Sequence, residues 1–208
     1  MAMLKGMSVQ LYDNETSETV YNILVGEPAR SETAYGLAAE YTLGIPKGDS
    51  HLWIDRKVRF FERDFQTIGE PLQGIEENIP LSWGMNVKVR QIISNGNCTI
   101  YKKNSMERHI LHDVCFHDNR GHIVVKDGEK RAGTATAYIY SVNNTENYIP
   151  EIGDIFVFGE CDFEFDTADQ KAMSESMKEF KADYPNYCVV RNVTAEYIGT
   201  RPNYEIVG

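Results

Sequence analysis

The densest group of side chains that could bind a metal ion lies between residues 109 and 122. Its members are four histidines, two aspartates and a cysteine: His109, His112, Asp113, Cys115, His117, Asp118 and His122. Imidazole and carboxylate groups are ligands for zinc or iron. On a strand, however, residues 109 and 112 point to opposite faces, as do residues 112 and 117. No His-x-Glu or His-Glu-x-x-His pattern accompanies them. We therefore expect exposed histidines on a hairpin and loop, and no metal site.

Four carboxylates follow an aromatic strand pattern and could bind calcium or form an acid–base pair: Asp162, Glu164, Asp166 and Asp169. A calcium loop needs a central glycine and a terminal glutamate at fixed offsets, and neither is placed correctly. A carboxylate pair for glycoside hydrolysis stays open, although nothing else in the sequence supports it. The pattern favours a solvated acidic face.

Motifs for nucleophilic or nucleotide chemistry are missing from the sequence. It contains no Gly-x-Ser-x-Gly and no Gly-x-x-x-x-Gly-Lys-Ser/Thr. Residues 46–49 (PKGD) open no helix, so they cannot present helix-terminal amides to a phosphate. The cysteines form no C-x-x-C pair, and we expect them to be reduced, partly buried residues: Cys98, Cys115, Cys161 and Cys188. The sequence thus predicts no catalytic residue, no metal and no cofactor.

The composition is that of an acidic globular chain. Its 208 residues include 21 Lys+Arg and 31 Asp+Glu, which gives a formal net charge of −10. With 12 Tyr, 9 Phe and 2 Trp, the aromatic content favours strand-rich cores. Apolar runs are far shorter than the ~20 residues of a membrane span, and the polar start argues against a signal peptide. We expect a soluble intracellular protein that does not bind nucleic acid through a broad cationic face.

Alternating apolar and polar residues predict strands along most of the first 92 residues. A hairpin is expected over residues 7–25, and further strands at residues 41–45, 57–61 and 63–68. The most regular alternation, at residues 86–92, ends at Ser94-Asn95-Gly96-Asn97, which is a strong turn or linker signal.

After this linker the same order of strand patterns repeats. Residues 9–12 (VQLY) correspond to residues 98–101 (CTIY) at an offset of 89, and residues 41–43 to residues 138–140 at an offset of 97. Residues 57–61 correspond to residues 154–158, again at 97. A difference of eight residues fits one loop insertion in a duplicated unit. The predicted fold is therefore mainly β, with two small β-barrel or β-sandwich domains at residues 1–93 and 94–208, the second a candidate duplicate of the first.

One helix is predicted over residues 167–183, packed on the second domain. Thr167 and Gln170 have the spacing of a capping box, and Pro185 limits the end of the helix. Residues 160–183 hold eight acidic residues and three lysines, a net charge of −5. Glu175 and Glu179 lie in this segment, and we expect it to face either a channel lumen or a basic partner.

Residues 69–83 hold two prolines and several apolar residues that look exposed. One interpretation is an ordered surface loop. The other is a contact segment, because Ile79, Leu81 and Trp83 are typical interface anchors. Both interpretations stay open at this point.

Five strings in the first domain are distinctive in combination: LKGMSVQLY (4–12), ILVGEP (23–28), YTLGIPKGDSHLW (41–53), GEPLQGIE (69–76) and IPLSW (79–83). Through them, residues 4–92 resemble the small head-completion, or head–tail connector (stopper-like), proteins of long-tailed bacteriophages of Gram-positive hosts. Residues 98–208 are similar, more weakly, to phage minor capsid proteins, through IGDIFVFG (152–159) and VVRNVT (189–194). The union of both units in one chain departs from the separate short proteins of those families.

The resemblance implies a structural virion protein of the phage neck, not an enzyme, made and assembled in the host cytoplasm. Its subunits would form a ring, with a hexamer favoured, between portal or adaptor proteins on the head side and a tail terminator or tail tube on the other. The ring would close the DNA-filled head and dock the tail, and DNA would pass through its lumen without specific binding. An acidic lumen suits this role because like charge repels phosphates.

The interface candidates under this interpretation are six residues: Trp53, Ile79, Leu81, Trp83, Glu175 and Glu179. The alternative within the virion is a tail terminator or tail-associated minor structural protein. From another class, the chain could be a non-virion binding module or a hydrolase whose carboxylates the sequence does not pair.

Overall fold

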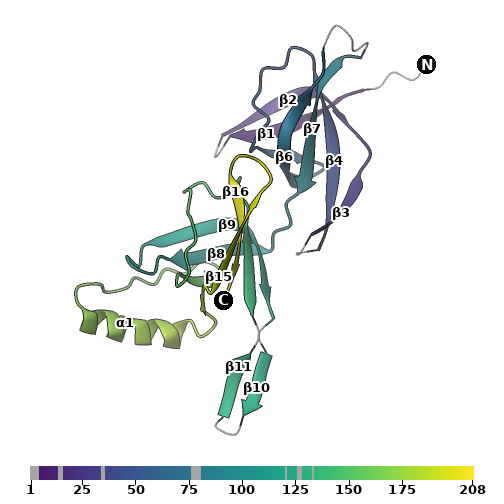
Figure 1. The fold of residues 1–208 in the computed structure, drawn as a ribbon. Coiled ribbons are helices and arrows are strands. Elements are labelled where there is room, and N and C mark those ends of the chain that lie inside the picture. The colour runs from purple at the N-terminus through teal and green to yellow at the C-terminus, as the bar shows by residue number, and fades with distance from the viewer. Residues whose placement is uncertain are drawn as a thin grey trace. The chain divides into compact units, whose positions relative to one another are not determined.

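The computed structural model describes residues 5–13, 16–33, 36–75, 81–119, 121–125, 128–132 and 134–208 (Figure 1). The chain divides into two compact units. Unit 1 comprises residues 1–93, 141–145 and 197–202, and unit 2 comprises residues 94–140, 146–196 and 203–208. Within the described residues, both units are built on antiparallel β-sheet, and a single helix belongs to unit 2. The predicted fold class, mainly β with one helix on the second domain, is confirmed.

Unit 1 is a small barrel. Its six barrel strands are β1 (Met7–Asp13), β2 (Thr16–Val25), β4 (Gly36–Pro46), β5 (Lys57–Phe60), β6 (Arg63–Gln73) and β7 (Trp83–Gln91). They are ordered β2-β1-β5-β6-β7-β4, and β4 pairs again with β2, which closes the sheet on itself. A seventh strand, β3 (Ala29–Thr33), pairs with the first residues of β4 outside this closed ring.

The core of unit 1 follows from the period-two pattern of its strands, because alternate residues of a strand face the same side. Val9 and Leu11 of β1 are buried, and so are Val87 and Val89 of β7. Phe60 and Phe65 stack with ring centroids 4.1 Å apart. Burying each large side chain contributes about 1.5–3 kcal/mol, so this aromatic pair is a main source of barrel stability.

Unit 2 is built on an open sheet. Its strands are β8 (Gly96–Tyr101), β9 (Arg108–Asp118), β12 (Ala135–Ile139), β13 (Ile155–Phe158), β14 (Cys188–Val189), β15 (Asn192–Tyr197) and β16 (Pro202–Val207). They are ordered β14-β13-β8-β9-β12-β16-β15. Between β9 and β12 in sequence, β10 (Gly121–Val125) and β11 (Gly128–Ala132) form a separate two-stranded sheet.

The sheet of unit 2 is buried on both faces at β8 and β13. Ile100 and Phe156 are partners in the β8–β13 ladder and belong to the main core of the unit. Tyr101 and Ile155, the next pair, face the other side and belong to a second core beneath α1 (Gln170–Asp183). Phe180 of α1 is fully buried in this second core, which explains why two successive residues of one strand are both apolar.

The start of the helix corrects the sequence prediction. The capping box from Thr167 to Gln170 does not form; α1 begins at Gln170, and Asp169 is its N-cap. The Asp169 carboxylate accepts hydrogen bonds from the backbone N–H groups of Lys171 and Ala172, both at 2.8 Å. A carboxylate is well suited to this position because it also faces the positive end of the helix dipole. The predicted end at Asp183 agrees with the structure.

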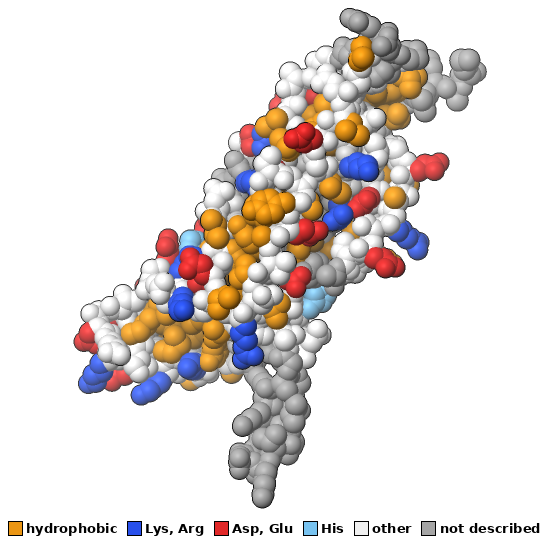
Figure 2. Space-filling view, viewed as in Figure 1, with side chains coloured by type: hydrophobic (Ala, Val, Ile, Leu, Met, Phe, Trp, Pro, Cys, Tyr) orange, Lys and Arg blue, Asp and Glu red, His pale blue; other side chains and the backbone are white. Residues whose placement is uncertain are grey.

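The underside of α1 is aromatic. Partly buried side chains surround Phe180 there: Met106, Phe163, Phe165, Met177, Tyr184 and Tyr187. In Figure 2, hydrophobic side chains gather beside α1, at the lower left, next to lysine or arginine side chains. The apolar side of the helix is therefore used for packing on unit 2.

The four cysteines are free and buried, as predicted for small hydrophobic residues. Burial raises the pKa of the Cys98 thiol, and the nearby Cys188 raises it further. Both thiols belong to the main core of unit 2.

Candidate protein-interaction site

The β6–β7 hairpin of unit 1 carries several exposed apolar side chains near its end. Near its end Leu72 pairs with Asn86 and Gln73 with Met85, and the Gly74 N–H donates to the Gly84 carbonyl at 2.9 Å. Strand β6 therefore continues to Gln73, so residues 69–73, which one of the two interpretations placed in a surface loop, are strand instead. The register shifts between Ile68 and Leu72. Pro71 fits this irregular stretch, because proline cannot donate to a regular ladder.

We call the exposed apolar residues at the end of this hairpin the β6–β7 tip: Leu72, Ile75 and Leu81. Their relative exposures are 68%, 66% and 52%. Leu72 is displayed by backbone that is already paired with β7, so little backbone entropy is lost when this residue docks onto a partner. Exposed apolar side chains near one end of a hairpin are typical of protein-binding surfaces.

Trp83 fastens the base of the tip to the barrel. Its indole Nε1–H donates to the Asn22 carbonyl of β2 at 2.7 Å. A Cβ atom at Gly44 would lie 3.4 Å from Trp83 Cβ and Cγ and 3.2 Å from Leu24 Cβ, so the glycine leaves room for the indole. Tyr21, which precedes Asn22, is 71% exposed. Trp83 is thus an anchor within the protein, with one part of its ring left accessible.

The predicted interface candidates separate into three groups. Leu81 is exposed at the tip and Trp83 supports it, whereas Ile79 lies outside the described residues. Trp53 is only 1% exposed and belongs to the core of unit 1, so it presents no surface to a partner. Trp53 can be buried because its one polar group has a partner inside the protein: the indole Nε1–H donates to Asp49 Oδ2 at 2.8 Å. Glu175 and Glu179 are exposed on α1, and Glu175 lies 4.0 Å from Lys171.

Leu72, Ile75 and Tyr21 were not singled out by the sequence analysis. Leu72 and Ile75 lie in the segment predicted as loop or contact surface, and their type offered no reason to prefer them over Ile79. Tyr21 lies between the inward-facing Val20 and the positive-φ residue Asn22. A large aromatic residue at an outward position of an alternating strand is the signal that identifies it.

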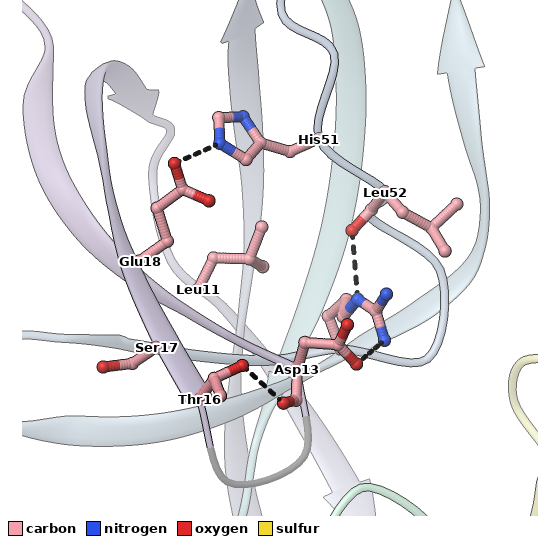
Figure 3. A pocket seen from close by; sticks show the side chains of 8 residues that line it. Leu11, Asp13, Thr16, Ser17, Glu18, His51 and Leu52 are labelled. Atoms are coloured by element: carbon pink, nitrogen blue, oxygen red, sulfur yellow. Dashed lines mark hydrogen bonds and ion pairs between the residues drawn. The ribbon is translucent and has the colours of Figure 1, made fainter.

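A depression of about 480 Å³ lies between the β1–β2 hairpin and the connection from β4 to β5, and residues of both segments line it (Figure 3). Two charged pairs line it. His51 Nε2 lies 3.3 Å from Glu18, and Arg56 Nη1 lies 2.8 Å from Asp13. Arg56 Nε–H also donates to the Leu52 carbonyl at 3.3 Å. These two pairs link the β4–β5 connection to the β1–β2 hairpin. The charged residues that line the depression therefore have a structural role.

His51 is the centre of this connection. Its Nδ1 lies 2.5 Å from Asp49 Oδ1, and the hydrogen bond to Asp49 raises the pKa of the imidazole. Partial burial opposes this rise, and Glu18 reinforces it. Asp49 also accepts from the Trp53 indole, so one carboxylate holds two rings of the same connection.

A comparable buried carboxylate organises a connection of unit 2. Asp154 is fully buried and accepts hydrogen bonds from Tyr148 Oη–H at 2.5 Å, from Lys103 N–H at 2.8 Å and from Glu151 N–H at 2.9 Å. The Lys102 ammonium lies 3.7 Å away. Burial, and then the neighbouring Asp154, raise the pKa of the Tyr148 phenol. A phenol that keeps its proton and donates it to a carboxylate is a structural donor, not a proton carrier.

The side chains of β9 that could in principle bind a metal ion do not converge on one point. His109 Nδ1 lies 2.6 Å from Glu146, His112 is exposed, and Cys115 Sγ lies 3.2 Å from His117 Nε2. His122 lies where side chains are not described. Within the described residues, no group of three or more His, Cys, Asp and Glu side chains is arranged to hold a metal ion. Burial raises the pKa of the Cys115 thiol, which weakens it as a nucleophile.

Three of the four carboxylates after β13 serve local structure. Asp169 caps α1, Asp166 Oδ1 accepts the Ala168 N–H at 3.0 Å, and Asp162 accepts from Tyr184 Oη–H at 3.2 Å. All four, including Glu164, are exposed. They line the outside of the segment that leads into the helix.

Comparison with known proteins gives one family. A model described as a family of unknown function, DUF6751, matches residues 93–208, which is more than half of the chain, and the chain belongs to that family. The match spans unit 2 from its first strand to the end of the chain. No curated protein and no solved structure matches the chain. Among the described residues, no helix has the length and apolar character needed to span a membrane.

Proposed function

We propose that this member of the DUF6751 family is a structural assembly protein, a ring subunit of the neck of a long-tailed phage that connects the DNA-filled head to the tail. In this role unit 1 contacts a neighbouring neck component through the β6–β7 tip. The chain would act as a connector or stopper and not as a catalyst.

The observation that carries the proposal is the tip itself. Leu72, Ile75 and Leu81 are each more than half exposed. Leu72 lies on backbone that is paired with β7, and Trp83 fixes the base of the hairpin to β2. Exposed apolar side chains are favourable only when a partner removes them from water. The paired backbone at Leu72 and the fixed base at Trp83 support stable assembly, because little conformational entropy is lost there on docking.

The polar clusters support the same conclusion. Asp49, Asp154 and Asp169 each accept several hydrogen bonds from their own connection or helix, so these carboxylates hold loops in place. The assignment to the neck depends on the resemblance of residues 4–92 to head–tail connector proteins. The net charge of −10 is compatible with a channel for DNA, since like charge lowers retention of phosphates.

The test is deletion of the gene from its phage, followed by electron microscopy of the particles. We expect filled or leaking heads without tails, and rescue by the wild-type chain. Tails of abnormal length would instead identify a tail terminator, and normal infectious virions would contradict any neck role.

Rescue with variants then tests the tip. Leu72→Ser with Leu81→Ser should fail to attach tails, because both changes remove apolar contact area without touching the barrel core. Leu37→Ser is the matched control, since Leu37 is also an exposed leucine of unit 1, at 62%, but lies on β4 away from the tip residues. Full rescue by the tip variant would contradict the proposed docking surface.

A further inference from the structure

Strand β3 leaves one edge of the sheet of unit 1 open. It pairs with the first half of β4, from Ala29↔Glu40 to Thr33↔Gly36, and it is the last strand in the order of that sheet. Figure 1 shows β3 beside β4. Among the strands that the structure describes, β4 is its one neighbour. A strand edge of this kind offers a row of backbone N–H and C=O groups to another chain.

The side chains of β3 divide between two faces. Ser31 pairs with Ala38, which is only 2% exposed, so this face of the strand is turned toward the interior of the unit. Arg30 and Glu32, on either side of Ser31, belong to the opposite face, and both are exposed. The strand therefore presents one positive and one negative charge on its outer face, at equal distances from Ser31.

These two charges are complementary to those of a second copy of the strand. When two β3 edges pair antiparallel about a twofold axis at Ser31, the two copies of Ser31 lie opposite each other, and Ala29 lies opposite Thr33. Arg30 of each copy then lies opposite Glu32 of the other copy. The contact therefore contains two cross-strand pairs of opposite charge, which stabilise an antiparallel sheet.

The same charges disfavour the neighbouring registers. A twofold antiparallel pair keeps each residue on the same face in both copies, so the centre of the pair must lie on a residue. A centre at Arg30 would place two arginines opposite each other, and a centre at Glu32 would place two glutamates opposite each other. Like charges that lie directly opposite are destabilising. The register centred on Ser31 is the one that places Arg30 opposite Glu32.

We propose that two copies of the chain associate through their β3 edges, in the antiparallel register centred on Ser31. The same surface is used by both copies, so the contact ends at a dimer. Five residues from each copy make a small contact, and we therefore expect a weak dimer that exchanges with the monomer. The inference goes beyond the proposed function and does not rest on it, because it concerns the chain free of head and tail components.

Charge reversals in the full chain test the contact by sedimentation over a range of protein concentrations. Arg30→Glu replaces both ion pairs of the dimer by two acidic pairs, and Glu32→Arg replaces them by two basic pairs. Because each substitution acts twice in a twofold contact, each variant should dimerise about tenfold more weakly than the wild-type chain. High salt should reduce this difference, since it screens exposed charges.

Restoration of opposite charges is the decisive measurement. The double variant Arg30→Glu with Glu32→Arg exchanges the two charges, so opposite charges again face each other across the dimer. A mixture of the two single variants does the same, because one copy is acidic at both positions and the other is basic. Both should recover dimerisation to within about threefold of wild type. The control is Arg63→Glu, at an exposed arginine of β6, which should dimerise like wild type.

A cysteine at the centre of the contact tests the register. Residues that lie opposite each other in an antiparallel ladder have Cα atoms about 4.5–5.5 Å apart, which a disulfide can span. Ser31→Cys should therefore give a disulfide-linked dimer when oxidised with copper–phenanthroline. Ala29→Cys is the matched control, because its two copies would lie roughly 13 Å apart along the strands. The four native cysteines are buried, so the wild-type chain should give little cross-linked dimer.

A wild-type chain that stays monomeric at every concentration would overturn the inference. Single variants that dimerise like wild type would overturn it too, as would no recovery in the variant with exchanged charges. Cross-linking of Ala29→Cys as strong as that of Ser31→Cys would contradict the register and with it the proposed contact. Particle images from the deletion phage judge the neck role separately, so either conclusion can fail without the other.

Discussion

The two units arrange their strands in the same way over most of each sheet. In unit 1, β1 lies between β2 and β5, while in unit 2, β8 lies between β9 and β13. In the same sense, β4 pairs with β2 and β7, and β12 pairs with β9 and β16. The three sequence correspondences at residues 9–12, 41–43 and 57–61 fall on β1, β4 and β5, whose partners in the second half fall on or directly beside β8, β12 and β13. This agreement supports a duplication.

The units differ in two connections and in one strand. The turn at Phe61 and Glu62 joins β5 to β6, whereas α1 is inserted between β13 and β14. Unit 1 has β3 between β2 and β4, and unit 2 has β10 and β11 at the equivalent place in the sequence. From Val9 to Tyr41 there are 32 steps and from Cys98 to Tyr138 there are 40, so the eight extra residues lie in the part that contains β10 and β11. Equivalent frames thus acquire different surfaces through their insertions.

The position of β6 explains why one sheet closes and the other is open. In unit 1, β6 is one strand that pairs with β5 and with β7. Unit 2 has two short strands there, β14 on β13 and β15 on β16, separated by Val190 and Arg191. A strand that is interrupted cannot bridge both neighbours, and α1 covers the outer face of β8 and β13 instead.

Truncating one core aromatic in each unit should have the largest effect. Phe65→Ala and Phe180→Ala each remove a fully buried ring, and each should lower the free energy of unfolding by about 3–5 kcal/mol. Both tryptophans belong to unit 1, so fluorescence reports on the barrel, and far-UV circular dichroism of α1 reports on unit 2. We expect Phe65→Ala to shift the fluorescence transition and Phe180→Ala the helix signal. Equal shifts of both signals in both variants would show that the units unfold as one.

The two loop-organising aspartates should differ in importance. Asp154→Asn replaces a fully buried acceptor of three hydrogen bonds and should cost about 3 kcal/mol, because an amide N–H₂ would then face donors. Asp49→Asn should cost about half as much, since its partner His51 is partly exposed. Denaturant unfolding measures both. Glu151→Gln, whose side chain is 59% exposed, is the control and should change stability by less than about 0.5 kcal/mol. A larger cost at Asp49 would contradict this ranking.

The helix start offers a direct test of sequence against structure. Asp169→Ala removes the N-cap and should cost about 1 kcal/mol, with loss of helix signal in circular dichroism. Thr167→Ala should leave the signal unchanged, because Thr167 lies before the cap. If Thr167→Ala were the more damaging change, the capping box would be restored as the correct interpretation.

The smallest effect concerns the pH dependence of unit 1. The pKa of His51 is raised in the folded state by its hydrogen bond to Asp49. The stabilisation is therefore complete below the unfolded pKa of about 6.5 and is lost as pH rises through the folded value. Unfolding followed by tryptophan fluorescence should show a loss of less than about 1 kcal/mol above neutral pH, typical of a partly exposed pair.

The same measurement on His51→Gln should lose this dependence on pH. His112→Gln, an exposed histidine of unit 2, should keep it. Stability that rises with pH through this range in the wild type would contradict the direction of the shift.

Much of the fold could be predicted from patterns among residues that are close in sequence. Alternation in residues 86–92 predicted a strand that the structure has at Trp83–Gln91, and Pro185 correctly limited the end of α1. The absence of C-x-x-C spacing correctly predicted free, buried cysteines. These features depend on neighbours close in sequence, which a single chain reveals.

Features that depend on distant partners were not predictable. Trp53 and Trp83 look equally suited to an interface, and only the contact of Trp53 with Asp49 inside the folded connection makes it a core residue. Pro71 interrupts the strand pattern in the sequence, yet β6 continues past it to include Leu72. It can do so because Pro71 lies where the register between β6 and β7 shifts, and only the pairing with β7 defines that shift. Closure of the barrel depends on β2 meeting β4, which no periodicity encodes.

That closure is made by a short ladder. Leu24↔Gly44 and Val25↔Leu43 are the two pairs that join β2 to β4, with one more hydrogen bond from Gly26 N–H to the Thr42 carbonyl at 2.9 Å. On its other side, β4 is joined to β7 by seven pairs. Local opening follows the weakest set of contacts, so amide protons along this seam should exchange with solvent before those of β7. The barrel is thus a curved sheet that is closed by one short ladder between β2 and β4. The space that Gly44 leaves for Leu24 and Trp83 allows this ladder to form.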